Sequence, residues 1–102
     1  MPDFEIFETE IFSKIFDGLD KREHEWISKI KHQLRQNPFG GKPLRFKWFR
    51  EKKFENKRLY FLVSEKTQRV LLIAFAGKKD QQHVIEQILL DKEKYFQFVE
   101  NV

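Results

Sequence analysis

Positive charge is concentrated in two short parts of this sequence, and both are candidates for binding phosphate. Residues 42–58 hold eight lysines and arginines against two acidic residues. Lys78 and Lys79 follow an apolar run that ends at Ala76, so they lie where the buried part of a strand stops. Basic clusters beside strands suggest a polyanion partner, most often a nucleic acid. The alternative is a solvated, lysine-rich sheet edge that discourages aggregation, but eight bases in one stretch exceed what edge protection requires.

A proton carrier near this charge would have to come from the residues that follow it. His83 is the only side chain just past Lys78 and Lys79 that titrates close to neutral pH. We therefore consider it the candidate proton carrier, with a solvated helix histidine as the alternative. His24 and His32 fall on the polar side of an expected helix, which favours surface positions for both.

Two aromatic residues, Phe49 and Phe54, are interleaved with the basic residues. Exposed aromatics in such a place can stack on nucleobases, although core packing is the favoured alternative for each. Other nucleotide chemistry finds little support in the sequence. No glycine-rich phosphate loop precedes a helix, no His/Asp/Glu cluster has metal spacing, and no RNA-recognition-motif aromatic signature is present. We expect no metal and no small-molecule cofactor.

Length and composition are those of one globular domain, which we expect to span residues 1–102. Hydrophobic residues make up 40% of the chain and charged residues 35%, so a core under a heavily charged surface is expected. There is no cysteine, which excludes disulfides and thiolate metal sites and fits a reducing compartment. No signal-peptide pattern or membrane-length apolar run is present, so cytoplasmic localisation is expected.

The first third of the chain predicts one strand and two helices. Residues 4–7 are a short strand candidate, and Thr9 can cap a helix over residues 10–17. Asp20 and Glu23 form a capping-box pattern that opens a second helix, which Asn37-Pro38 ends. The apolar stripe of this second helix consists of Trp26, Ile27, Ile30 and Leu34.

The rest of the chain predicts three strands and a final helical stretch. Residues 39–43 are expected to be a loop, residues 44–48 alternate between apolar and basic, and residues 50–57 form a charged connection of undefined shape. Residues 59–63 and 70–76 have the length and composition of paired antiparallel strands, and the second, apolar throughout, is typical of a central strand covered on both faces. A helical stretch with a break near Asp91 follows. The predicted fold is α+β, with the order β-α-α-β-β-β-α and helices packed on a mostly antiparallel sheet.

This order, together with particular residues, resembles the RelE/ParE superfamily of toxins from bacterial and archaeal toxin–antitoxin pairs. The strand Arg58-Leu59-Tyr60-Phe61-Leu62-Val63 and the apolar strand ending in Ala76-Gly77-Lys78-Lys79-Asp80 are similar to the family's two central strands. Gly41-Lys42-Pro43-Leu44 is similar to its approach to the second strand. The resemblance covers nearly the whole chain.

The resemblance implies a compact toxin that a cognate antitoxin protein holds inactive. In the RelE-like branch, which we favour, the toxin binds the ribosome and cleaves mRNA without a metal. In the ParE-like branch, the toxin inhibits DNA gyrase by binding. A third possibility is a nucleic-acid-binding domain of the same fold without catalytic activity.

The resemblance also implies roles for individual residues. Arg58 matches the family's strand arginine that contacts the scissile phosphate, Lys79 falls where RelE-like toxins carry a basic residue, and Lys47 is a plausible equivalent of the basic residues on the second strand. With His83, these are the candidate catalytic residues. The family's last-helix tyrosine has no counterpart before Tyr95. The remaining basic residues are expected to meet phosphates: Lys42, Arg45, Arg50, Lys52, Lys53, Lys57 and Lys78.

Overall fold

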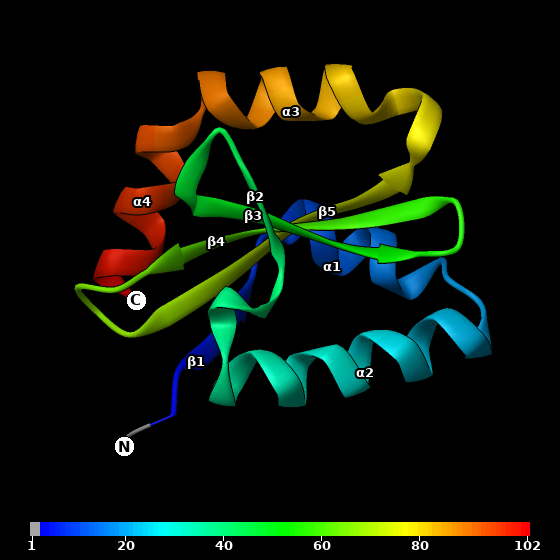
Figure 1. Ribbon diagram of the computed structural model, residues 1–102, viewed down its shortest axis with the longest axis horizontal. Coiled ribbons are helices and arrows are strands. Elements are labelled where there is room, and N and C mark those ends of the chain that lie inside the picture. The colour runs from blue at the N-terminus through cyan, green and yellow to red at the C-terminus, as the bar shows by residue number, and fades with distance from the viewer. Residues whose placement is uncertain (1–2) are drawn as a thin grey trace.

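A computed structural model describes residues 3–102, in which one five-stranded sheet lies between two pairs of helices (Figure 1). The strands are β1 (Glu5–Glu8), β2 (Lys42–Leu44), β3 (Phe46–Phe54), β4 (Lys57–Ser64) and β5 (Arg69–Gly77). The helices are α1 (Glu10–Asp17), α2 (Lys21–Gln36), α3 (Gln81–Leu90) and α4 (Lys92–Asn101), with short 3₁₀ turns at Pro38–Gly40 and Lys78–Asp80. No helix in this part of the chain is long and apolar enough to cross a membrane.

The sheet has the order β1-β5-β4-β3-β2, with β1 parallel to β5 and every other pair antiparallel. β4 and β5 therefore occupy the interior of the sheet, as the apolar runs predicted. Because helices cover both faces, side chains of either parity along these strands are buried, and nearly every position of β4 is buried. The predicted α+β fold with a mostly antiparallel sheet is confirmed.

Two hydrophobic cores lie on opposite faces of the sheet. The first joins α1 and α2 to the sheet through Phe12, Ile27, Ile30, Leu34, Leu59, Phe61, Val63, Val70, Leu72 and Phe75. The second joins α3 and α4 to the other face through Phe49, Tyr60, Leu62, Leu71, Ile73, Ile85, Ile88 and Val99. The alternation of β4 between the two cores follows from the pleat, which sends successive side chains to opposite faces.

The helix starts predicted from the sequence are confirmed. The Thr9 hydroxyl accepts a hydrogen bond from the Phe12 amide at 3.0 Å and so caps α1. Asp20 and Glu23 form the complete capping box of α2, with reciprocal bonds of 2.8 and 3.1 Å. The expected break near Asp91 is also present, since this residue separates α3 from α4.

The predictions for residues 39–57 were wrong in two respects. Lys42 and Pro43, expected in a loop, form the short edge strand β2 together with Leu44. Arg45 then turns the chain with φ of 66°, which interrupts the expected strand over residues 44–48. The charged stretch after Phe49 continues as β3 as far as Phe54 and pairs with β4. Charged residues can occupy a strand here because Arg50 and Glu51, though buried, both have polar partners.

Candidate functional site

The basic residues of the segment 42–58 do not form one surface, because the pleat of β3 and β4 divides them between the two faces of the sheet. Arg50 and Lys57 point toward the α2 face, where their partners lie, and Lys52 borders a hollow beside the end of α2. Glu51 and Arg58 point toward α3, and the register places Lys53 opposite Arg58. The strand parity therefore puts Arg50 and Lys57 on the opposite face of the sheet from Arg58 and Lys53.

Arg50 is a buried structural residue. Its Nε donates to the Gly41 carbonyl at 3.1 Å, while the two terminal nitrogens donate to the carbonyls of Lys47 at 2.8 Å and Phe39 at 3.1 Å. The guanidinium also lies 5.1 Å from the centroid of the Phe39 ring. Arg50 was expected to meet a phosphate, but its donors are used to hold the 3₁₀ turn and β2 against β3.

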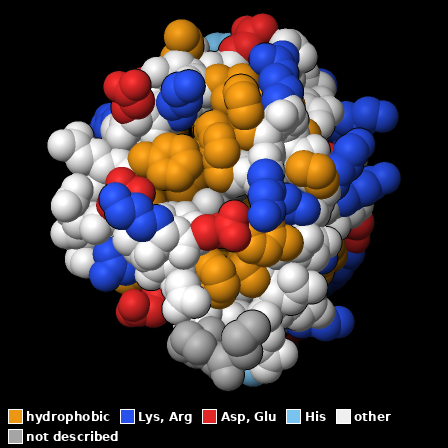
Figure 2. All heavy atoms as spheres, turned by 60° about the vertical axis from the view of Figure 1, so that its left-hand side comes forward, with side chains coloured by type: hydrophobic (Ala, Val, Ile, Leu, Met, Phe, Trp, Pro, Cys, Tyr) orange, Lys and Arg blue, Asp and Glu red, His pale blue; other side chains and the backbone are white. Residues whose placement is uncertain are grey.

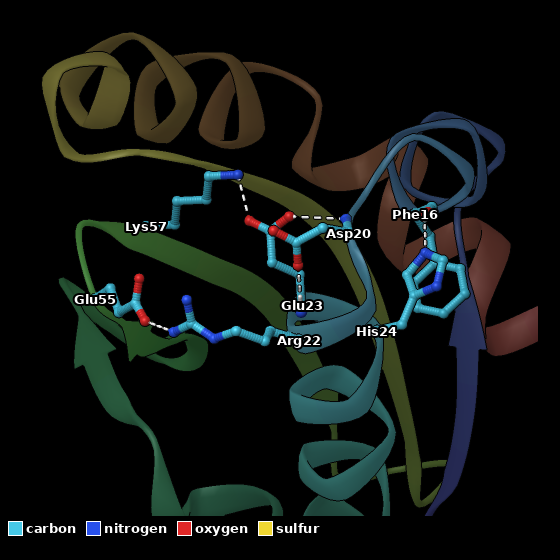
Figure 3. A network of polar contacts seen from close by, with 7 residues as sticks. All are labelled: Phe16, Asp20, Arg22, Glu23, His24, Glu55 and Lys57. Carbon is cyan, nitrogen blue, oxygen red and sulfur yellow. Dashed lines mark hydrogen bonds and ion pairs between the residues drawn. The ribbon is translucent and has the colours of Figure 1, made fainter.

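Lys57 is likewise committed to the fold. Its ammonium pairs with the buried Glu23 carboxylate, which also accepts from the Asp20 amide at the start of α2 (Figure 3). Arg22, one residue before Glu23, pairs with Glu55 in the turn between β3 and β4. These contacts attach the start of α2 to the β3–β4 hairpin, so Lys57, also expected to meet a phosphate, is not free to do so.

Arg58 lies at the α3 end of the sheet in a buried polar cluster. Its Nε is 4.0 Å from Oε2 of Glu51 on the neighbouring strand, and its Nη1 donates to the Lys57 carbonyl. Gln81, the first residue of α3, donates to the same Glu51 oxygen at 3.2 Å. Glu51 therefore attracts the guanidinium from one side, and no second carboxylate among residues 3–102 forms an ion pair with Arg58.

Tyr60 belongs to the same cluster, two residues along β4 from Arg58. Burial raises the pKa of its phenol to about 12, and the nearby Glu51 charge adds to this effect while Arg58 opposes it. The hydroxyl is buried and has no hydrogen-bond partner among the described residues. At neutral pH, Tyr60 therefore keeps its proton and can only donate one.

Exposed cations border this cluster on the solvent side. A cleft of about 510 Å³ is lined by Pro43, Leu44, Arg45, Lys78, Lys79, Gln81, Gln82 and Ile85. Lys78 and Lys79 occupy the turn after β5, and the backbone amide of Lys78 donates to the Asn56 carbonyl. No ion pair to another of residues 3–102 engages Arg45, Lys53, Lys78 or Lys79, so these four charges are available to an anion.

Lys47 lies far from Arg58 and Lys79, contrary to the expectation that the three would share one face. The register pairs Phe49 with Leu62 and Lys53 with Arg58, which puts Lys47 at the opposite end of β3. There its ammonium pairs with Glu65 at 3.3 Å and lies over the Phe39 ring. Lys42 is exposed on β2, where it pairs in register with Glu51.

His83 is exposed on α3 and is not brought to the cluster. Gln81, Ile85 and Ile88 define the side of α3 that faces the sheet. At 100° per residue, His83 lies on the opposite side of the helix. Among the other histidines, His32 is exposed as expected, but His24 is half-buried, with its ring 4.2 Å from that of Phe16.

The sequence reasoning missed Glu51, Tyr60 and Gln81 as members of the Arg58 cluster. An acidic residue in an otherwise basic segment was the available signal for Glu51, but its link to Arg58 depends on the β3–β4 register. Within residues 3–102, no group of three or more His, Cys, Asp or Glu side chains could hold a metal ion.

No protein-family model and no curated protein matches this sequence. Solved structures do match. A double-arginine mutant of the E. coli toxin RelE in the free state aligns with a TM-score of 0.69 and 20% identity, over 84% of this chain and 93% of that chain. A chain of the toxin–antitoxin complex RelBE2 from Mycobacterium tuberculosis aligns with a TM-score of 0.65 and 17% identity, over 76% and 93%.

An archaeal RelE–RelB complex, from Pyrococcus horikoshii, gives a TM-score of 0.63 at 11% identity, with 74% of this chain and 96% of that chain covered. Each alignment spans most of both chains although little sequence is shared. Agreement of this kind establishes the fold. The chain has the RelE/ParE-type toxin fold, as the resemblance of its two central strands indicated.

Proposed function

We propose that this chain is the toxin of a type II toxin–antitoxin pair and cleaves mRNA on the ribosome. The observation that carries the proposal is the link between Arg58 and a lysine-lined cleft in a RelE-type fold. Gln81, which donates to the Glu51 carboxylate beside Arg58, also lines this cleft. A cleft of this charge suits a nucleic-acid backbone. The ribosome and mRNA are cytoplasmic, so the proposal includes that compartment.

The proposed reaction is attack of a ribose 2′-hydroxyl on the adjacent phosphodiester, with departure of the 5′-oxygen. Negative charge increases on the phosphate oxygens in the transition state, and oriented cations stabilise it. Arg58, oriented by Glu51, supplies one such cation, and Lys79 supplies a second from the turn after β5. Arg45, Lys53 and Lys78 then hold flanking phosphates.

The proposal assigns proton transfer to water, which accepts the proton of the 2′-hydroxyl and donates one to the departing 5′-oxygen. Tyr60 holds its proton at neutral pH, so it does not act as the acceptor for the 2′-hydroxyl. His83 was the candidate carrier from sequence, but it faces away from Arg58. The proposal therefore gives the chain a role in binding and charge stabilisation and assigns the orientation of the RNA to the ribosome.

We further propose a cognate antitoxin, because several solved structures with this fold are complexes of RelE with RelB. Exposed Ile11 and Phe98 line an apolar hollow of about 430 Å³ between α1 and α4, which is a candidate footprint. An acidic segment of the antitoxin could also cover the lysines of the cleft. The contact with the lysines would block the proposed phosphate contacts and so explain how the toxin is held inactive.

The test is inducible expression with primer extension on a reporter mRNA, followed by cleavage assays with purified protein and ribosomes. Arg58→Lys and Lys79→Ala are the informative variants, with His83→Gln as the matched control. Loss of one oriented donor predicts a decrease of about 100- to 1,000-fold in the cleavage rate for Arg58→Lys. Lys79→Ala should reduce the rate less, because its flexible ammonium is a single point charge. His83→Gln should cleave at the wild-type rate.

The alternatives give different outcomes. Growth arrest with intact mRNA would refute the nuclease proposal, and DNA damage before any decline in translation would indicate the gyrase inhibitor instead. Harmless expression of a folded protein would indicate an inactive nucleic-acid-binding domain. Loss of cleavage in His83→Gln, with normal stability, would restore the histidine as proton carrier and contradict the site described above.

A further inference from the structure

The start of β3 carries an aromatic stack that the Arg58 cluster does not use. Phe46 and Trp48 lie with ring centroids 5.3 Å apart and an interplanar angle of 14°, so their faces are stacked. Phe46 is the outer ring and remains 43% exposed. Phe49 and Phe54, for which core packing was favoured over stacking on nucleobases, are not accessible in this way, because Phe49 is fully buried and Phe54 packs on Trp26.

The inner ring of this stack is fixed from behind. Trp48 meets Phe96 of α4 edge-on at 4.9 Å and packs on Phe49 at 5.6 Å. Figure 2 shows apolar side chains gathered on the face that includes α4, with both basic and acidic side chains around them. Phe46 therefore presents a ring whose position is set by the core and whose outer surface is free, which lowers the conformational entropy lost when a planar ligand binds.

The stack adjoins one end of the basic cleft, where Leu44 and Arg45 lie. Arg45, which precedes Phe46, and Leu44, which pairs with Phe46 across the β2–β3 hairpin, both line the cleft with Lys78 and Lys79. Leu44 also packs against the second core, as Trp48 does, so the cleft and the stack open on the same side of the sheet. A ligand that bridges the two would carry negative charge at one part and a flat, apolar group beside it.

We infer that Phe46, supported by Trp48, is a stacking platform for a nucleobase of the single-stranded RNA whose phosphates occupy the Arg45–Lys78–Lys79 cleft. The inference deepens the proposed function, on which it rests, by naming a contact to a base next to the contacts to the backbone. Base–aromatic stacking accepts any of the four bases, because every base has a π-face. The platform therefore adds affinity for RNA without a sequence requirement.

A protein segment is the competing occupant of an exposed aromatic surface. The charge of the neighbouring cleft favours RNA, since Arg45, the residue before Phe46, lines the cleft together with Lys78, Lys79 and two glutamines. A peptide would need only apolar area from Phe46, whereas a base needs a flat ring. Substitutions that keep the area but remove the ring separate these two requirements.

The experiment measures fluorescence anisotropy of two labelled oligomers at low salt, one a short single-stranded RNA and the other an abasic oligomer with the same number of phosphates. Wild type should bind the RNA more tightly. Phe46→Leu should weaken RNA binding by about 5- to 150-fold and leave the abasic oligomer unaffected. Phe46→Trp should restore the RNA affinity. Lys79→Ala should weaken both oligomers, because it removes a phosphate contact.

Phe98→Leu is the matched control, since Phe98 has a similar exposure of 45% but lies in the hollow between α1 and α4. It should bind both oligomers as wild type does. Equal affinity of wild type for the two oligomers, or RNA binding by Phe46→Leu equal to that of wild type, would overturn the inference. The second result, with wild-type mRNA cleavage on the ribosome, would leave the proposed nuclease function standing and assign the exposed ring to protein contacts.

Discussion

Arg50 gives the sharpest distinction between a residue that holds the fold and one that binds phosphate. It was expected from sequence to meet RNA, yet it is only 8% exposed and donates three hydrogen bonds to backbone carbonyls. Arg50→Lys keeps the charge but removes the planar fork, so one ammonium must replace donors that reach three separate carbonyls. The substitution is therefore conservative for a phosphate contact and disruptive for a structural one.

The magnitude follows from these bonds. Hydrogen bonds to charged groups contribute about 1.5–3 kcal/mol each when buried, and less where water reaches the acceptor. Only the bond to Gly41 is fully buried, and a lysine can recover one of the three. We expect Arg50→Lys to lower the free energy of unfolding by about 2–3 kcal/mol. For a chain of this length, that corresponds to a decrease in Tm of roughly 10–15 °C.

The assay is urea and thermal unfolding followed by circular dichroism, together with RNA binding measured below the transition. Arg45→Lys is the matched control, because Arg45 is exposed at the tip of the β2–β3 hairpin and should change stability by less than about 0.5 kcal/mol. Arg50→Lys should be less stable but bind RNA normally while folded. Unchanged stability combined with weaker RNA binding would refute the structural assignment and return Arg50 to the phosphate site.

Two further predictions concern single buried positions. Tyr60→Phe should change stability at neutral pH by less than about 1 kcal/mol, because the hydroxyl has no partner among the described residues. With a folded pKa of about 12 against 10 when unfolded, Tyr60 makes the wild type lose about 2–3 kcal/mol as pH rises through this range, since only the unfolded state releases the proton there. The variant should lose correspondingly less, and identical alkaline unfolding curves would contradict the assigned pKa. Gly41→Ala should cost about 1–3 kcal/mol, because a Cβ would lie 2.8 Å from the Glu51 carbonyl oxygen and 2.9 Å from the Phe61 ring. Gly77→Ala, where a Cβ meets nothing within 4 Å, is its control in the same unfolding experiment, and equal stabilities for the two variants would count against this packing argument.

The parts of the fold that sequence predicted are those decided by local pattern. The apolar run of β5, the cap at Thr9 and the capping box at Asp20 and Glu23 each depend on residues close together in the chain. β3 was missed after Phe49 because a run of charged residues lacks the alternation that marks a strand. Its burial depends on partners such as the Gly41 carbonyl, which local pattern cannot supply.

The candidate site was predicted only in part, because the strand register and the rotation of α3 decide which side chains reach it. Arg58 and Lys79 lie near the ends of two neighbouring strands, where Arg58 pairs in register with Ala76, three residues before Lys79. Their shared role at a phosphate stays a prediction. The position of Lys47 could be predicted only with the β3–β4 register, which puts this residue at the opposite end of the sheet. The direction of His83 could be predicted only with the rotation of α3 about its axis. Gln81 and Ile85 define this rotation, because both face the sheet. A shift of one residue in the β3–β4 register, or a rotation of α3 by one residue, would bring different side chains to the site.

The parallel pairing of β1 with β5 has a consequence for how the chain folds. Thr9, just after β1, donates to the carbonyl of Ile73 in β5, a separation of 64 residues. The β4–β5 hairpin, by contrast, closes over the short turn between Ser64 and Arg69. Loop-closure entropy delays distant contacts relative to near ones. We therefore expect β1 to pair with β5 after the β4–β5 hairpin has formed. On a translating ribosome, β1 remains without this partner until β5 has been synthesised.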